Sequence, residues 1–216
     1  GSPAKGIPAL EWMLWKSPPP QPGTSACRYA ELVGADLQAE AAGVSQGFAQ
    51  LAQREWLDNE QDASPLMGEV INQWLGAIEQ LRWREIGKPL ASAQAGEPPQ
   101  FSRHMSGTPP EPLWLAAWQA IHQIATLQGM TYPSPDGRQH VPVDIYLLGK
   151  GLSGPGLTLR QAARDADVDM QKLQHQHEAD ARQRALKALA GLQQQIQNTV
   201  APALQISIGF SDSDGD

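Results

Sequence analysis

The chain is poor in cysteine, in surplus positive charge and in long apolar runs. Its 216 residues include a single cysteine, Cys27, so no disulfide can form within the chain. Lysine and arginine number 16 against 23 acidic residues, which gives a net charge of -7. With no basic stripe either, the charge pattern excludes a nucleic-acid-binding protein, because that class needs clustered cations against the phosphates. No apolar run approaches the ~18 residues that a membrane-spanning helix needs.

The common motifs of catalytic metal sites are missing too. There is no His-Glu-x-x-His, and one cysteine cannot form a zinc-binding pair. His175, His177 and Glu178 form the densest group of candidate ligands. Residues two apart on a helix point to different sides, so a solvated polar helix face is the favoured interpretation. His122 lies beside the apolar stripe of its helix and is predicted to be a packed core histidine.

Two glycine motifs match catalytic or nucleotide-binding patterns only in their letters. Residues 149–154 match G-x-G-x-x-G after a strand-like apolar run, Val143–Leu148. Pro155 and Gly156 then separate the motif from the next predicted helix, so a phosphate could not sit on the helix N-terminus as this fingerprint requires. Residues 43–47 match G-x-S-x-G but lie inside a long helical pattern, whereas a nucleophile elbow needs a strand-to-helix turn.

Helical periodicity runs through most of the chain, with apolar residues recurring at intervals of three and four. It predicts an all-α, up-and-down bundle of about four long helices. The expected helices cover residues 1–16, 25–57, 64–87, 110–129 and, after a short helix, a last stretch ending near Thr199. As domains, we expect a single helical domain over 1–216, made of a first helix (1–16), a proline-rich linker (17–24) and a bundle (25–216).

Local signals set the expected helix ends. Ser64-Pro65 predicts a start and Gly87 with Pro89 a stop. Capping boxes are predicted at 108–111 and 158–161, and the closely spaced aspartates at 165–169 indicate a break with a new start. Residues 91–110 are predicted to be a loop, 131–157 to be irregular, and the alternating tail 204–210 to be extended.

The segment Lys5–Trp15 is the most informative part of the sequence. It reads as a helix that is apolar nearly all round, and such a helix belongs inside a larger body. Its one acid is Glu11, whose burial costs free energy unless the carboxylate is paired or functional. A helix face that reaches solvent, or a salt bridge to a covering segment, is the alternative interpretation.

This segment resembles the signature of the imelysin-like family, Gly-x-His-x-x-Glu followed by aromatic and aliphatic residues. Gly6 and Glu11 match the signature, but Pro8 stands at the histidine position. A weaker resemblance follows at Ile86–Leu90, and the tail from Ile208 resembles the family's terminal sequence more specifically. The family's domain has two helical bundles with the signature near the middle. The resemblance therefore implies that this chain is the second half, and that an N-terminal bundle, on a separate chain or in an earlier region, packs on the first helix.

The resemblance implies three classes of function. The first is a non-catalytic protein of the bacterial periplasm or cell envelope, with or without a lipid anchor on a preceding segment, that serves iron uptake by binding a ligand or a partner. The second is an imelysin-type metallopeptidase or metal-binding protein. The third is a structural helical module without a site. No cofactor is required by the sequence, and a divalent metal or iron would have Glu11 at most as a signature ligand, because proline offers no lone pair.

The candidate binding site implied by the two-bundle arrangement is the seam at the first helix. Glu11 is expected to face this seam with Trp12 and Trp15 packed on either side. The polar loop with Ser102, Arg103 and Ser106 could reach the same seam. Arg103 is the expected counter-ion of Glu11, because a guanidinium can hold a carboxylate through two parallel hydrogen bonds.

Overall fold

The computed structural model describes residues 5–15, 18–53, 60–97, 110–126, 141–176 and 178–209, without the side chains of residues 60–63. Every regular element in these ranges is helical, which confirms the predicted all-α fold. The chain divides into two compact units. The first carries α1 and α2, and the second carries all later helices, so the boundary follows α2 rather than the proline-rich linker. The expectation of one domain over residues 1–216 stays a prediction.

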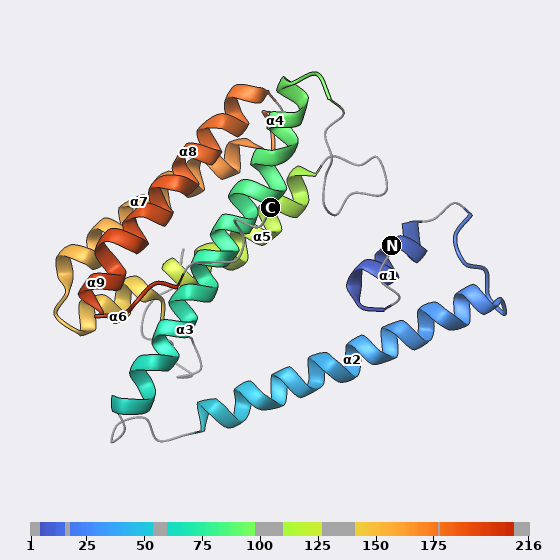
Figure 1. Cartoon of the computed structure of the whole chain (residues 1–216), viewed down its shortest axis with the longest axis horizontal. Coiled ribbons are helices and arrows are strands. Elements are labelled where there is room, and N and C mark those ends of the chain that lie inside the picture. The colour runs from blue at the N-terminus through green and yellow to red at the C-terminus, as the bar shows by residue number, and fades with distance from the viewer. Residues whose placement is uncertain are drawn as a thin grey trace. The chain divides into compact units, whose positions relative to one another are not determined.

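The first unit is a pair of helices, α1 (Ile7–Trp15) and α2 (Ser25–Ala52), which contact each other. The second unit, a helical bundle, is shown in teal to red in Figure 1. Its elements in chain order are α3 (Glu60–Glu79), η1 (Gln80–Gly87), α4 (Lys88–Gln94), α5 (Glu111–Ala125), α6 (Val143–Gly149), α7 (Ser153–Lys172), α8 (Ala179–Gln195), η2 (Ile196–Val200) and α9 (Ala201–Ala203).

The bundle has a continuous apolar core to which every long helix contributes. Trp74 of α3 and Trp118 of α5 are almost completely buried, and the indole Nε1 of Trp74 donates to the carbonyl of Ile121 at 3.0 Å. Apolar side chains of α7 and α8 at helical spacing complete this core. These fully buried residues are Leu159, Ala163, Ala166 and Met170 on α7, its C-cap residue Leu173, and Ala185, Leu189 and Leu192 on α8.

Two π-helical turns, η1 and η2, each precede a proline. The predicted helix end at Gly87 and Pro89 is wrong. The helical path continues through η1 into α4, and this helix ends after Gln94. η2 likewise leads into α9, which contains Pro202. A proline lacks the N–H for an i→i-4 bond and its ring crowds the carbonyl one turn back, and a widened turn relieves that crowding.

Several other predicted boundaries are also wrong. The second helix ends at Ala52 rather than near Leu57, whose own position lies outside the described residues. α3 starts at Glu60 and contains Pro65 inside it, so Ser64 does not cap it. α5 ends at Ala125, short of Gly129, and it begins at Glu111 with Pro110 as its N-cap, so Glu111 is its first residue rather than the third. Thr108 lies outside the described residues.

The region around the G-x-G-x-x-G letters is helical rather than irregular. The strand-like run forms α6, and the motif makes the turn from α6 into α7, where Gly151 adopts a φ of 77°. Thr158 lies inside α7, and its hydroxyl donates back to the carbonyls of Gly154 and Pro155 at 3.1 Å. The predicted capping box at Thr158 and the break at the aspartates are therefore wrong, because the buried stripe of α7 runs unbroken past both.

The histidine-rich segment and the tail complete the bundle. α7 ends at Lys172, so His175 lies in a turn, and Glu178 is the N-cap residue of α8. His177 lies outside the described residues. Residues 206–209 have no regular structure and lie against α3. The Asn72 amide donates to the carbonyl of Ser207 at 3.4 Å and accepts from the N–H of Gly209 at 3.1 Å.

Candidate functional site

The residues at two positions of the signature, Gly6 and Pro8, suit the start of a helix. Gly6 adopts a φ of 85°, a left-handed conformation that suits glycine, and its carbonyl accepts the first helical hydrogen bond from Leu10 at 3.2 Å. Pro8 follows as the second residue of α1, where a missing N–H costs nothing. The residue at the histidine position therefore helps to start the helix and supplies no ligand atom.

Most of the large apolar side chains of α1 are exposed. Only Ala9 and Met13 are buried, and Glu11 is half-buried between them in sequence. The other large side chains face outward, and their exposed fractions are 68% for Ile7, 38% for Trp12, 59% for Leu14 and 57% for Trp15. The expected packing of Trp12 and Trp15 around Glu11 at a seam with a partner half stays a prediction.

α2 repeats this pattern over a longer helix. Thr24 caps it by accepting a hydrogen bond from the N–H of Cys27 at 3.2 Å. Of its 28 residues, Val33 is the one that is buried. Large apolar side chains stay exposed along its length, namely Tyr29, Leu32, Val44 and Phe48. The two helices of the first unit together therefore expose far more apolar side-chain surface than they bury.

The remaining predicted site residues cannot be compared with α1. Ser102, Arg103 and Ser106 lie outside the described residues. The Glu11–Arg103 ion pair therefore stays a prediction. The charged contact that the structure does give near α1 joins the Lys5 ammonium to the Glu40 carboxylate of α2 at 4.0 Å, with both side chains exposed. A pair of this kind adds little to stability, because water screens it.

Inside the bundle, two ion pairs tie helices together that sequence reasoning did not connect. The Arg182 guanidinium of α8 contacts the Glu111 carboxylate at the start of α5 at 2.7 Å, and the Glu111 side chain is 3% exposed. The same guanidinium lies 5.6 Å from the centre of the Trp114 ring. The sequence predicts Glu111 to be part of a capping box, and the signal for its burial is its place beside an apolar stripe.

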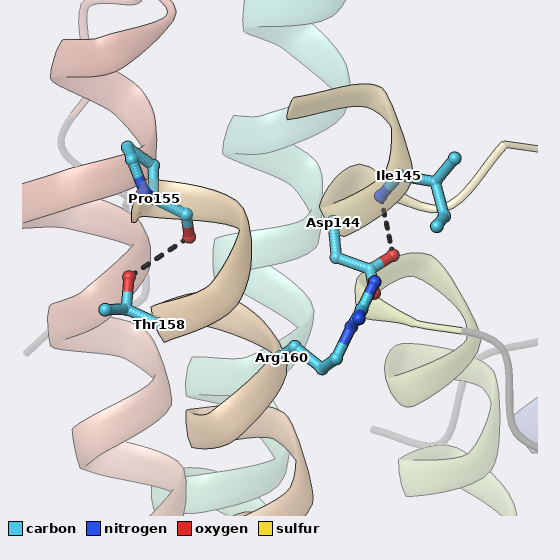
Figure 2. A network of polar contacts seen from close by, with 5 residues as sticks. All are labelled: Asp144, Ile145, Pro155, Thr158 and Arg160. Carbon is cyan, nitrogen blue, oxygen red and sulfur yellow. Dashed lines mark hydrogen bonds and ion pairs between the residues drawn. The ribbon is translucent and has the colours of Figure 1, made fainter. Parts of the chain in front are cut away.

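The second ion pair fastens α6 to α7 (Figure 2). Asp144, with a side chain 1% exposed, accepts from Nε of Arg160 at 2.8 Å and from the N–H of Ile145 at 2.7 Å. Both carboxylate oxygens therefore have a donor, as a buried charge requires. Gly156 packs on this corner, since a Cβ there would lie 3.1 Å from the carbonyl oxygen of Asp144.

His122 is the one buried histidine among the described residues, which confirms its predicted core position. Its ring lies 5.2 Å from that of Trp118, whose Nε1 donates to Asp167 at 2.8 Å. Burial lowers the pKa of His122, while the negative charges of Asp167 and Asp144 oppose this shift. Nε2 of His122 has no hydrogen-bond partner in the described part of the chain. A neutral imidazole held this way is a packing residue.

The described part of the chain offers few groups for metal or membrane chemistry. Across the described ranges, no group of three or more histidine, cysteine, aspartate or glutamate side chains could hold a metal ion. No helix among the described residues is long and apolar enough to cross a membrane. What α1 offers chemically is one carboxylate surrounded by large apolar and aromatic side chains.

Comparison with known proteins agrees with the resemblance of the signature. No curated protein and no solved structure matches the chain significantly. The model of one family, described as Imelysin, matches residues 2–205, which is nearly the whole sequence. This chain is therefore a member of the imelysin family.

Proposed function

We propose that this chain is a non-catalytic, partner- or ligand-binding protein of the bacterial cell envelope that serves iron uptake. The observation that carries the binding role is the uncovered apolar surface of α1 around the half-buried Glu11. Membership of the imelysin family supports the envelope location and the link to iron, through the properties that the resemblance implies.

The surface of α1 is large enough to drive a stable association. Burying one large apolar side chain contributes about 1.5–3 kcal/mol, and Ile7, Leu14 and Trp15 are each more than half exposed. A helix of nine residues is also too short to be stable alone in water, so packing must hold it. Both facts favour a partner that covers α1.

The partner that we propose is a helical segment of the same polypeptide that precedes the signature. In the two-bundle arrangement of the family, such a segment would pack on α1 and enclose Glu11. Aliphatic and aromatic side chains with one basic group facing Glu11 would complement this surface. A separate envelope protein for iron uptake would then dock on the assembled two-bundle form.

The non-catalytic part of the proposal rests on Pro8. A hydrolytic metal site needs several ligands and a base, and the side chain at the signature's histidine position has no lone pair. Metal analysis of the purified protein tests this point. We expect less than stoichiometric zinc or iron, whereas a stoichiometric metal that is lost in Glu11→Ala would contradict the proposal and favour the metallopeptidase.

Iron uptake by cells carrying variants tests the binding role. In the source bacterium, the gene is replaced by a copy that encodes the Leu14→Ser variant. Uptake of labelled iron is then measured under iron limitation. Leu157→Ser is the matched control, because Leu157 of α7 is 55% exposed against 59% for Leu14. We expect uptake to fall several-fold in Leu14→Ser alone. Equal uptake in both variants and in wild type would contradict the proposed role of α1.

A further inference from the structure

A groove on the bundle lies between the π-helical turn η1 with α4 on one side and α8 on the other. Its volume is about 710 Å³, within the range of small-molecule sites. The two walls run antiparallel. Nε of Arg82 donates to Oε1 of Gln193 at 3.1 Å, and further along a Cβ at Gly87 would lie 3.6 Å from Leu186.

The floor of the groove is apolar and carries an uncovered indole. Three tryptophans of the bundle, Trp74, Trp114 and Trp118, are 1%, 3% and 0% exposed, whereas Trp83 is 52% exposed. Its ring lies against Gly87, because a Cβ at that glycine would be 3.1 Å from Cε3 of Trp83. The absence of a side chain at Gly87 thus lets the ring lie along the groove beside Leu186 and Leu90.

The lining of the groove contains three cationic side chains and one acidic side chain, Asp180. Arg82, Arg184 and Lys187 line it, and none of them forms an ion pair within the described residues. Both arginines are held by neutral amides, Arg82 by Gln193 and Arg184 by Gln176 at 3.0 Å. Such a contact orients a guanidinium and leaves its charge available.

Asp180 is the acid that lines the groove, and it lies at the first turn of α8. The antiparallel register places this end of α8 beside the end of α4, far from the Arg82 end. The lining therefore keeps a net positive charge although the whole chain has a net charge of -7. A local cationic groove on an acidic protein attracts an anion by its own field rather than by the charge of the whole molecule.

We propose that this groove binds a small aromatic organic anion. The flat ring of the ligand stacks on Trp83 above Leu186, and its carboxylate accepts hydrogen bonds from Arg184, Lys187 or Arg82. Guanidinium groups suit this role because they offer paired donors to a carboxylate. This site is separate from α1 and does not depend on the function proposed for α1.

Calorimetric titration of the full chain with three probes tests the proposal. 2-Naphthoate carries both ring and carboxylate, 2-naphthamide has the ring without the charge, and inorganic phosphate has the charge without the ring. We expect 2-naphthoate to bind at least about tenfold more tightly than either other probe, and its affinity to fall as salt is raised. Equal affinity for 2-naphthamide would overturn the proposal, because binding would then need no cation.

Variants locate the site. Arg184→Gln and Trp83→Ala are each expected to weaken binding of 2-naphthoate about tenfold, the loss typical of one charge-assisted hydrogen bond or one aromatic stack. Arg164→Gln removes the same charge from an exposed position of α7 that does not line the groove, and Phe48→Ala removes an exposed aromatic side chain of α2. Both controls should bind like wild type. Unchanged affinity in Arg184→Gln, or an equal loss in Phe48→Ala, would overturn the assignment.

Discussion

The Arg182 guanidinium and the Glu111 carboxylate meet at 2.7 Å although 71 residues separate them in the sequence. Each lies near the N-terminus of its own helix, α8 and α5, so the pair ties together the beginnings of two core helices. Breaking a buried pair leaves a charge without its partner, which costs more than the pair contributes when it is formed.

Glu111→Gln is therefore expected to lower the free energy of unfolding by about 2 kcal/mol, below the full range for buried pairs because Arg182 is 22% exposed. Urea denaturation measures this loss. The control is Lys172→Met, which breaks the surface pair with Asp169 and should cost at most about 0.5 kcal/mol. Equal losses in the two variants would show that Glu111 is not in a buried pair.

Asp144→Asn should loosen α6 in particular. Asp144 accepts from Ile145 and from Arg160 through different oxygens, and asparagine replaces one of these oxygens by an NH2 group that would face one of the two donors. We expect amide hydrogen exchange in α6 to become about tenfold faster, corresponding to about 1.4 kcal/mol, while exchange in the middle of α8 is unchanged. Uniform acceleration through the bundle would contradict this local role.

His122 should make stability fall in mildly acidic solution. Since burial lowers its pKa below the ordinary value of 6.5, the unfolded chain binds more protons than the native one at pH values between the two pKa values. Its contribution is complete above pH 6.5 and is lost as the pH falls toward the native pKa. Below pH 6.5 this group lowers the unfolding free energy by up to about 1.4 kcal/mol per pH unit.

Denaturation of wild type and His122→Leu at pH 7.5 and 5.5 checks the sign. The wild type should lose more stability than the variant between these two pH values, because other titrating groups contribute to both proteins alike. A larger loss in His122→Leu would mean that the native state favours the protonated imidazole.

Two glycine substitutions should have opposite effects. A Cβ at Gly87 would lie 3.0 Å from the carbonyl of Arg82 and 3.1 Å from Trp83, so Gly87→Ala should destabilise the protein by about 1–3 kcal/mol. Gly191 lies inside α8 with nothing within 4 Å of the added Cβ. Gly191→Ala should stabilise by about 0.5–1 kcal/mol. Thermal unfolding of both variants measures the difference, and a common sign would contradict the close packing of Arg82 and Trp83 around Gly87 within η1.

The fold class could be predicted from the sequence because apolar residues recur at helical spacing in every long helix. The same residues pack together in the core. The errors fall where one local signal competed with that packing. Thr158 and the aspartates predict a helix start and a break, but α7 carries buried residues from Leu159 to Met170 at unbroken helical spacing. At Pro89, a widened turn lets the helix continue past a residue that usually ends one.

The candidate site could be predicted only in part. Glu11 stood out because one acid interrupts an apolar helix, and this signal is local. The partners of Glu111 and Asp144 come from other helices, and nothing local in the sequence gives such pairings. The two walls of the groove beside Trp83 also come from distant parts of the sequence. Arg82 and Gln193 approach each other only when α8 packs on η1.

The central claim is that a partner covers α1 in the native protein, and amide hydrogen exchange in α1 tests it most directly. Exchange of Met13–Trp15 is compared between the protein isolated from the envelope of its source cells and the 216-residue chain alone. If a partner covers α1, exchange in the protein from cells should be at least about 100-fold slower, equivalent to about 2.7 kcal/mol of protection. Equal exchange rates in the two samples would contradict it.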